Sequence, residues 1–303
     1  MTQLTQMQIQ AILANKTFHD CMIQNKIIDT DLYRVYLALR PGDAYALSVM
    51  DLKQKFMDDE DIHDDLYFRN AQKAFEDFRE EIKNQYYLYQ KFYTDEQSAR
   101  NLIKIERFAE IEYQDTYLLC TLFPYYPTLH IFAKLNPFSE EIVIDAACQC
   151  LQGLDKLHQN NICHRNIKPN NIFCIVENNQ RCFKLGGYEF CREIPADSDE
   201  ILSPVLMNTP YYAAPESFLG NMGKYSDIYA SGMVLYWLCD DYHSSNVLYN
   251  LKHSQGCWLP RPKHGSEALW QIIQKALDIR IQNRYQDARE MLEALQALKQ
   301  DAA

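Results

Sequence analysis

A polar loop between a helix and a hairpin constrains the fold of this chain more than any other stretch. The loop, residues 162–171, reads Ile-Cys-His-Arg-Asn-Ile-Lys-Pro-Asn-Asn. Before it, residues 142–159 carry apolar side chains at the three- and four-residue spacing of a helix. After it, residues 171–176 and 181–185 are short β-rich runs, separated by Glu177-Asn-Asn-Gln180, which has turn composition. The sequence therefore predicts a long helix, a polar loop and a β-hairpin in succession.

The composition allows a large buried core and disfavours two classes of partner. The chain has 303 residues, of which 47% are hydrophobic, and this suits one large domain or two lobes. Its net charge of −11 argues against nonspecific binding to nucleic acid or anionic membrane, since both require a basic face. The first twenty residues lack the apolar core of a signal peptide, and residues 228–239 are too short to span a bilayer. We expect a cytoplasmic protein without nucleic-acid partners or membrane insertion.

The ten cysteines form no Cys-x-x-Cys pair, and most of them lie in apolar runs. We interpret them as buried thiols in a reducing compartment, in preference to disulfides or metal ligands. The acidic run at residues 58–65 lacks the glycine and the alternating ligands of a calcium loop. The sequence therefore predicts no metal site.

The loop resembles the catalytic loop of the protein-kinase superfamily, which reads His-Arg-Asp, then Lys after one residue, then Asn three further on. His164, Arg165, Lys168 and Asn171 match that pattern. Asn166 does not, because it stands where the family has the aspartate that accepts the proton of the substrate hydroxyl. A neutral amide is no general base at neutral pH. The resemblance therefore implies a kinase-like loop that has lost its base.

The resemblance implies an α+β, bilobal protein-kinase-like fold, with a small β-rich N-lobe containing one long helix and a larger, mainly helical C-lobe. We place an N-terminal extension at residues 1–20, the N-lobe at 21–123 and the C-lobe at 124–303. The long helix is predicted at residues 66–89, with Glu81 as its candidate ion-pairing glutamate. The N-lobe strands are predicted at residues 21–28, 32–39, 44–50, 102–108 and 116–123.

Two phosphate-binding features of the family are missing from the predicted N-lobe. Ser48 stands where active kinases have the lysine that grips the α- and β-phosphates, and a hydroxyl offers those phosphates no charge. Ile28, Thr30 and Tyr33 occupy the places of three glycines, which would let backbone amides approach phosphate closely. A relocated cation is the alternative, and the nearby candidates are Lys53, Lys55 and Arg34.

The magnesium ligand of the family is also replaced. Lys184-Leu-Gly-Gly-Tyr-Glu-Phe190 aligns with the Lys-Leu-x-Asp-Phe-Gly motif, which puts Gly187 on the metal-binding aspartate and Glu189 on the glycine. Without that carboxylate, the neutral Asn171 would hold magnesium poorly. We expect no resident cofactor, and any ATP to bind through Lys168, Asn171 and Glu189 without strong magnesium coordination.

The framework motifs of the family, by contrast, are present. Residues 209–216 resemble the segment that ends in Ala-Pro-Glu, and residues 286–298 resemble the end of bacterial Hanks-type serine/threonine kinase domains. The resemblance implies that Asp227 hydrogen-bonds the catalytic-loop backbone and that Arg284 pairs with Glu216. The fold-supporting residues are thus His164, Arg165, Glu216, Asp227 and Arg284.

The departures fall on one function, phosphate transfer. Ser48, Asn166 and Gly187 remove the phosphate grip, the base and the metal ligand, and loss of a general base alone slows a reaction by about 10²–10⁴-fold. We therefore predict a pseudokinase, which serves as a binding scaffold or allosteric regulator of a partner protein, such as an active kinase or its substrate. The alternative is a weak or unconventional ATP-dependent serine/threonine kinase or nucleotidyl transferase. A further hypothesis pairs Arg165 with a phosphorylated side chain at Ser198, Ser203 or Thr209.

Overall fold

The computed structural model describes residues 9, 18–29, 33–51, 89, 99–113, 116–135, 138–177, 179–202, 211–241 and 259–301. Several sequence predictions concern residues outside these ranges: most of the N-terminal extension, the acidic run, the long helix with Glu81, Thr30, Lys53, Lys55, Ser203 and Thr209.

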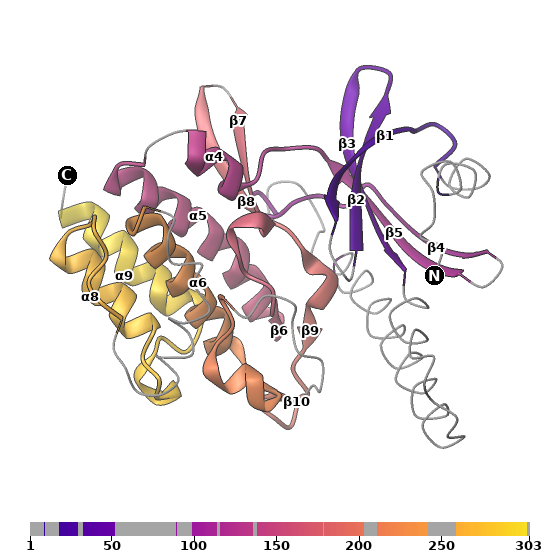
Figure 1. Cartoon of the computed structure of the whole chain (residues 1–303). Helices are drawn as coiled ribbons and strands as arrows, with labels where there is room; N and C mark the ends of the chain where they lie inside the picture. Colours follow the sequence, from indigo (N-terminus) through magenta and orange to yellow (C-terminus); the bar gives the residue numbers. More distant parts are fainter. Residues whose placement is uncertain are drawn as a thin grey trace. The chain divides into compact units, whose positions relative to one another are not determined.

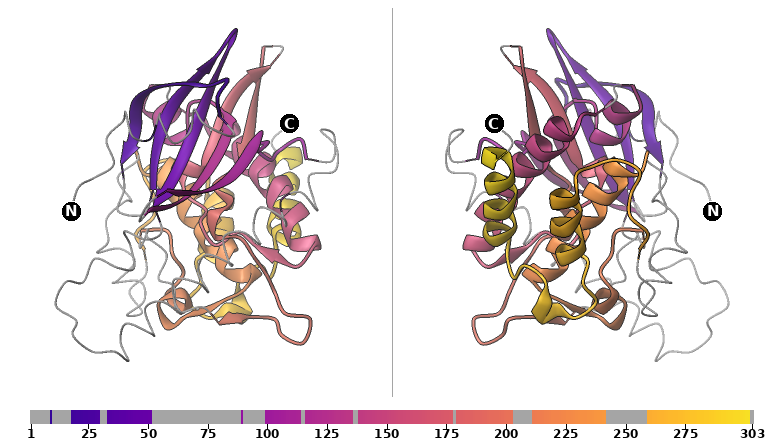
Figure 2. Two further views of the ribbon diagram at one scale, coloured as in Figure 1. Left: turned by 90° about the vertical axis from the view of Figure 1, so that its right-hand side faces the viewer. Right: turned by 90° about the vertical axis from the view of Figure 1, so that its left-hand side faces the viewer.

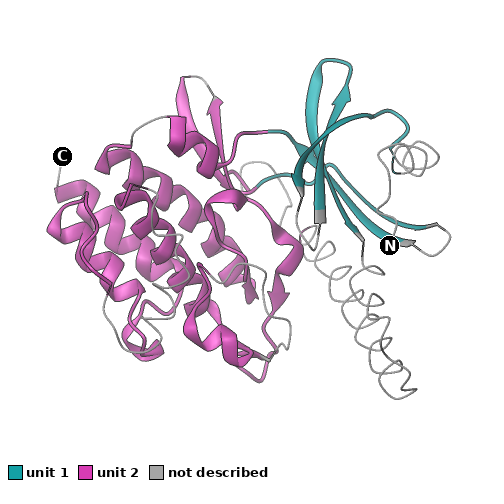
Figure 3. Cartoon of the chain, in the orientation of Figure 1, with its two compact units in different colours: residues 1–84, 103–125 teal, residues 85–102, 126–303 magenta. Residues whose placement is uncertain are grey.

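The chain divides into two compact units, which Figure 3 colours separately. Residues 1–84 and 103–125 form the first, called here the sheet unit, and residues 85–102 and 126–303 form the second, the helical unit. The predicted N-lobe includes residues 85–102, but the structure places them with the helical unit. At the end of this segment, the backbone N–H of Leu185 donates to the Asn101 carbonyl at 2.8 Å, and Leu102 forms an isolated β-bridge with Leu185, so these two described residues contact the helical unit.

The sheet unit is built on five antiparallel strands in the order β1-β2-β3-β5-β4 (Figure 1). Their bounds are β1 Met22–Asp29, β2 Tyr33–Arg40, β3 Asp43–Asp51, β4 Arg107–Tyr113 and β5 Thr116–Pro124. Strands β2 and β3 turn at two residues, where Gly42 takes a φ of +92° that side chains disfavour. One face of the sheet buries a core that includes Ile23, Tyr36, Ala38, Leu47, Val49, Leu118, Cys120 and Leu122.

The prediction of a strand at residues 102–108 was wrong. The strand in this region is β4, Arg107–Tyr113, which pairs with β5 from Arg107↔Leu122 to Tyr113↔Thr116. Leu102 and Ile103 are buried, but they lie in the irregular segment that precedes the strand. The apolar residues 102–103 therefore indicate a buried segment and not a strand. The position of the strand is set by the short connection from β4 to β5.

The helical unit contains five described α-helices. They are α4 Leu129–Leu135, α5 Glu140–Gln159, α6 Lys224–Cys239, α8 Glu267–Ala276 and α9 Ala288–Asp301. Nearly every residue of α6 is buried, as expected for a helix surrounded by others. Helices α5, α6, α8 and α9 contact one another, and Figure 2 shows α9 running alongside α5. This arrangement, with a separate β-sheet unit, confirms the predicted fold of a β-rich lobe and a mainly helical lobe.

The predicted succession of helix, loop and hairpin is confirmed. Helix α5 begins at the N-cap Ser139, whose Oγ accepts the backbone N–H of Ile142 at 3.4 Å, and it ends just before the loop. After the loop, β7 Ile172–Glu177 and β8 Gln180–Leu185 form an antiparallel hairpin. The loop is therefore anchored at both ends by regular structure.

Two short strand pairs and four 3₁₀ turns complete the described part of the unit. Strand β6 Ile162–Cys163 pairs with β9 Arg192–Glu193, and β10 Ile201–Leu202 pairs with β11 Asn221–Met222. Short 3₁₀ turns lie at η1 Pro169–Asn171, η2 Tyr188–Phe190, η3 Pro215–Leu219 and η4 Ile281–Asn283.

Each cysteine that the structure describes is a free thiol, and most of these thiols are buried; Cys257 lies outside the described ranges. Within the same ranges, no helix combines the length and the apolar character needed to cross a bilayer.

Candidate functional site

A buried carboxylate on α6, Asp227, holds the loop that carries the predicted site. Its Oδ1 accepts the backbone N–H of Arg165 and its Oδ2 that of His164, each at 2.7 Å. The ring of His158 donates to the same Oδ2 at 3.0 Å. Arg165 adopts a φ of +65°, a left-handed conformation that is uncommon outside glycine. Hydrogen bonds to Asp227 therefore stabilise a backbone turn that the chain would otherwise disfavour.

The His164 ring connects the loop to the segment after β8. Its Nδ1 accepts the backbone N–H of Asn166 at 3.2 Å, so Nε2 carries the proton and donates to the Gly186 carbonyl at 3.0 Å. Burial lowers the pKa of His164 to about 4, against the favourable charge of Asp227. His164 is therefore a neutral structural link at physiological pH.

Asn166 occupies the position of the general base, and its side chain is buried. The residue is 7% exposed, and its Nδ2 has no hydrogen-bond partner within the described part of the chain. It lines a cavity of about 30 Å³ together with Tyr212 and Ser217, which is room for one water molecule. The loop thus keeps its shape around a group that can donate a hydrogen bond but accepts no proton at neutral pH.

Asn171 and Gly187 meet where the family would hold magnesium. The side-chain Nδ2 of Asn171 donates to the Asn166 backbone carbonyl at 2.7 Å, and the backbone carbonyl of Asn171 accepts the Gly186 N–H at 2.8 Å. Gly187 has a φ of +77°, and a Cβ added there would lie 2.7 Å from Asn171 Oδ1 and 2.5 Å from Nδ2. The amide of Asn171 therefore fills the space in which a side chain at position 187 would begin.

The residues at this point do not fit a magnesium site. Magnesium needs a nearly octahedral shell of oxygens, which in proteins usually includes one or two carboxylates, and the glycine at position 187 supplies no side-chain oxygen. Among the residues that the structure describes, no cluster of three or more His, Cys, Asp and Glu side chains could hold a metal ion.

Lys168 and Glu189 are both half-buried and influence one another electrostatically. Burial lowers the pKa of the Lys168 ammonium, and the charge of Glu189 opposes this shift. Burial likewise raises the pKa of the Glu189 carboxyl, against the effect of its own backbone N–H and of Lys168. A nucleotide phosphate that approached Lys168 would therefore compete with a carboxylate of the same chain.

Ser48 lies in the sheet unit, at the centre of β3. It is 5% exposed and pairs in register with Val35 on β2 and Thr121 on β5. Ile28 and Tyr33, two of the positions that replace family glycines, lie in the paired strands β1 and β2. This unit therefore offers a hydroxyl within a continuous sheet at the place of the family lysine.

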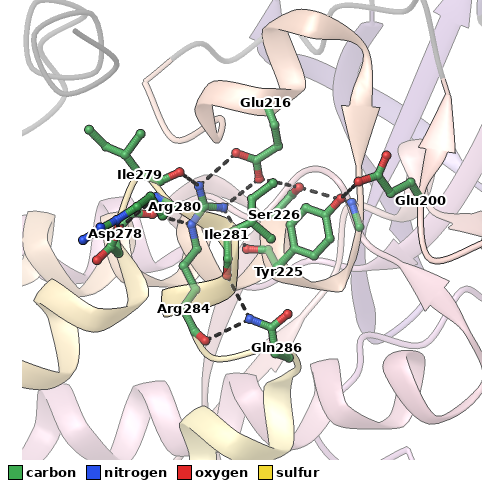
Figure 4. Close-up of polar contacts among 11 residues, drawn as sticks. Glu200, Glu216, Tyr225, Ser226, Asp278, Ile279, Arg280, Ile281, Arg284 and Gln286 are labelled. Carbon is green, nitrogen blue, oxygen red and sulfur yellow. Dashed lines mark hydrogen bonds and ion pairs between the residues drawn. The ribbon is translucent and has the colours of Figure 1, made fainter. Parts of the chain in front are cut away.

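The framework ion pair is buried, and Figure 4 shows the hydrogen bonds that it makes. Arg284 Nη1 and Nη2 donate to the two carboxylate oxygens of Glu216 at 2.7 and 2.9 Å. Ser226 donates to the same carboxylate at 2.8 Å, while Arg284 Nε donates to the Asp278 carbonyl at 2.6 Å. The guanidinium also lies 5.0 Å from the centre of the Tyr229 ring. The pair thus joins η3, α6 and the segment before α9.

Two residues of this framework were not predicted from the sequence. His158 donates to Asp227 and accepts the backbone N–H of Ala288 at 3.1 Å, which links α5, α6 and α9. Ser226 connects Glu216 to the start of α6. A histidine in the last turn of a helix is also typical of a favourable interaction with the helix dipole at an exposed helix end. Its sequence position therefore gives no signal of a buried link.

Comparisons with known proteins agree with this geometry. A family model described as the protein kinase domain matches residues 71–297. Similar proteins include a probable serine/threonine-protein kinase, nek3, of Dictyostelium discoideum, 32% identical over 153 residues, which are 48% of this chain and 13% of that protein. The serine/threonine-protein kinase Nek5 of Mus musculus is 34% identical over 152 residues, covering 48% of this chain and 24% of Nek5.

A bacterial relative gives a similar result. A probable serine/threonine-protein kinase of Clostridium perfringens is 28% identical over 170 residues, covering 53% of this chain and 24% of the relative. The matched segments thus span no more than 24% of the length of these three relatives. Because the family model covers most of the chain and the framework geometry fits it, this chain belongs to the protein kinase domain family.

Proposed function

We propose that this chain is a pseudokinase, which binds and regulates a partner protein instead of transferring phosphate. The observation that carries the proposal is that Asn166, a neutral amide, stands where the kinase family has an aspartate. Hydrogen bonds from the loop backbone to Asp227 and His164 hold the loop around Asn166 in a defined conformation. This supports our assignment of the amide to the position of the general base. A catalytic loop that keeps its hydrogen bonds but lacks the general base suits a binding protein better than an enzyme.

The metal position supports the same proposal independently. Gly187 supplies no carboxylate, and the Asn171 amide packs against it. Phosphoryl transfer depends on cations that bridge the phosphates and neutralise the developing charge. A chain that lacks both the base and a fitting metal site has lost two separate contributions to the rate.

The hydrogen bonds and the ion pair that stabilise the helical unit are intact, and binding of a partner protein would still require them. The buried Glu216–Arg284 pair and the bonds of Asp227 stabilise the helical unit whether or not phosphate is transferred. We propose an active kinase or a kinase substrate as the partner, and a cytoplasmic location. The relatives in the comparisons carry the names of serine/threonine kinases, and this supports the proposed role in kinase signalling.

A second candidate function, a weak ATP-dependent phosphotransferase or nucleotidyl transferase, rests on Lys168 and Asn171. Both match the family loop, and the named relatives are kinases. In this case Lys168, Asn171 and Glu189 would contact the nucleotide.

Thermal denaturation of the intact chain with ATP, with and without magnesium, separates the two candidates. A ligand at 100 times its dissociation constant stabilises a protein by about 2.7 kcal/mol. The pseudokinase proposal expects no magnesium-dependent rise in Tm and no transfer of labelled γ-phosphate to the chain itself or to a generic substrate. A magnesium-dependent rise, with phosphate transfer that is lost in Lys168→Ala, would overturn it in favour of the enzyme.

A partner experiment tests the regulatory half of the proposal. The purified chain is added to a panel of purified serine/threonine kinases, and both binding and the rate of each kinase are measured. We expect at least one kinase to bind and to change its rate on binding. If every kinase and its substrate leave the chain unbound at micromolar concentration, the regulatory role is wrong, whatever the outcome with ATP.

A further inference from the structure

A second concave surface lies on the helical unit, and none of the loop residues 162–171 line it. This groove has a volume of about 810 Å³, within the range of ligand-binding pockets in proteins. One wall is the outer face of α5, and the other is the β7–β8 hairpin with its turn. Arg100 and Asn101 close one side, and Lys299 on α9 contributes to the rim.

The floor of the groove is held in place by amide side chains. Gln149 Oε1 accepts the backbone N–H of Phe183 at 2.9 Å, and its Nε2 donates to the Arg181 carbonyl at 3.2 Å and to Asp145 at 2.9 Å. Asn101 donates to the Phe183 carbonyl at 3.2 Å. A floor fixed in the free protein loses little conformational entropy when a ligand binds.

Two arginines at the groove have guanidinium groups available for a ligand. Arg100 makes no hydrogen bond or ion pair with any residue that the structure describes. Arg181 lies with its guanidinium 6.0 Å from the centre of the Phe132 ring, a contact that orients the group and uses none of its N–H donors. Lys299, by contrast, is already paired with Asp145 at 3.0 Å.

The charges of the groove differ in sign from the charge of the chain. Three basic side chains, Arg100, Arg181 and Lys299, face two carboxylates, Glu141 and Asp145, whereas the whole chain has a net charge of −11. A local excess of guanidinium donors favours carboxylates, which accept paired N–H donors from arginine. The strongly acidic remainder of the chain disfavours a long polyanion such as nucleic acid, whose charges would continue beyond the groove, more than a short acidic peptide that ends within it.

Uncharged amides at the groove indicate a peptide in particular. Gln152 and Asn179 line it, and within the described ranges their side chains make no hydrogen bond. A side-chain amide both donates and accepts, as a peptide backbone does, whereas a phosphate diester only accepts. Val176 is 65% exposed at the edge of the groove and offers a contact for an apolar side chain.

We propose that this groove binds an acidic peptide segment of a partner protein. Arg100 and Arg181 pair with its carboxylates, Gln152 and Asn179 bond its backbone, and Val176 contacts an aliphatic residue between the acids. The proposal goes beyond the pseudokinase function and does not depend on it, because the groove contains no residue of the phosphotransfer site.

Fluorescence anisotropy with a labelled peptide, Glu-Glu-Ile-Glu-Glu-Ile-Glu-Glu, tests the proposal on the intact chain at 0.15 M salt. We expect saturable binding, weakened about tenfold in each of Arg100→Glu and Arg181→Glu. Arg289→Glu is the matched control, since Arg289 is 56% exposed on α9 and does not line the groove. It makes the same change in net charge and should leave the affinity within about twofold.

Three outcomes would contradict the proposal. The first is binding of the acidic peptide no tighter than binding of the same peptide with lysine in place of glutamate. The second is equal weakening in Arg289→Glu, which would indicate attraction to net charge alone. The third is equal competition by a single-stranded DNA oligonucleotide, which would assign the groove to polyanions. Circular dichroism of each variant shows whether it is folded.

Hydrogen exchange locates the bound peptide independently of the variants. Saturating peptide should slow exchange in residues 179–183 and around Arg100, and leave residues 162–171 unchanged. Protection confined to other segments would place the peptide elsewhere and overturn the assignment. Addition of ATP and magnesium should not displace the peptide, so this result and the nucleotide response of the chain can fail separately.

Discussion

At the scale of single residues, the candidate site differs from the pattern of the kinase family in its free space as well as in its charge. Replacement of a carboxylate by glycine normally leaves space, but here the Asn171 amide packs against Gly187 and donates to the Asn166 carbonyl. The sequence shows that position 187 lacks a carboxylate. It does not show which neighbour fills the space, because that depends on the rotamer of Asn171 and on the left-handed backbone of Gly187.

Gly187→Ala should destabilise the chain more than Gly42→Ala does. Both glycines have positive φ, a conformation that costs a residue with a side chain about 1–2 kcal/mol. A Cβ at Gly42 meets nothing within 4 Å, whereas at Gly187 it collides with Asn171. Chemical denaturation measures both variants. Adding Asn171→Ala should recover part of the loss at position 187 and none at position 42, and equal losses in the two single variants would contradict the packing argument.

The stability of the chain should fall as the pH is lowered from about 6.5 towards 4, in part because of His164. Burial holds the pKa of His164 at about 4, below its ordinary value of 6.5, so the unfolded chain binds a proton that the folded chain does not. The stabilisation is complete above pH 6.5 and is lost by about pH 4, a difference of roughly 3 kcal/mol.

Denaturation of the parent chain and of His164→Gln across this pH range measures the effect. Glutamine keeps a donor and an acceptor but does not titrate, so the variant should show a shallower dependence on pH. If His164→Gln follows the parent curve, His164 is not the titrating group.

At the scale of elements, the hairpin β7–β8 has an outer edge that is closed by side chains instead of a third strand. Gln149 and Asn101 bond the N–H of Phe183 and the carbonyls of Arg181 and Phe183. Exposed edges invite pairing with other chains, so this arrangement keeps a two-stranded sheet from acting as a template.

Gln149→Ala should expose this edge. The Phe183 N–H would lose its acceptor. A donor that is left unsatisfied away from water typically costs about 1–3 kcal/mol of stability. Hydrogen exchange at the Phe183 amide should accelerate, while amides of α6 keep their rates. Gln152→Ala on the same helix is the control, since Gln152 makes no bond to the strand. Unchanged exchange at Phe183 would show that water replaces the glutamine without loss.

Gly153→Ala tests how closely α5 approaches the segment before β4. Glycine within a helix is normally about 1 kcal/mol less favourable than alanine, so the substitution would stabilise an exposed helix. Here an added Cβ would lie 2.6 Å from the Asn101 backbone carbonyl and 3.1 Å from Leu102. Because backbone cannot rotate away, we expect a lower Tm. A higher Tm would mean that the segment yields easily.

The extent of sequence prediction differs between elements for physical reasons. The succession of α5, loop and hairpin was predictable, since helical spacing and turn composition are local signals. The start of β4 was not, because Leu102 and Ile103 are as apolar as a strand but are buried by contacts made across the chain. For the same reason the link from His158 to Asp227 and Ala288 joins residues that no local pattern connects.

At the scale of the whole molecule, one helix supports both the loop and the framework ion pair. Neighbouring residues of α6 perform the two tasks, since Asp227 bonds the loop backbone and Ser226 bonds Glu216. None of these contacts involves the positions where the phosphate-transfer groups are missing. The helical unit can therefore keep its structure without those groups, as the proposed pseudokinase function requires.

Glu216→Gln should separate folding from function most clearly. The Arg284 side chain is fully buried, and removing the charge of its partner leaves a guanidinium without a counter-ion. We expect this loss to lower the free energy of unfolding by about 3–5 kcal/mol. The double variant Glu216→Gln with Arg284→Met should be more stable than Glu216→Gln alone, since no buried charge remains. Arg289→Ala, which breaks the exposed pair with Asp155, should leave denaturation unchanged. If the double variant binds a partner of the parent chain with equal affinity, the ion pair serves the fold alone; weaker binding by a folded double variant would place the pair in the binding surface.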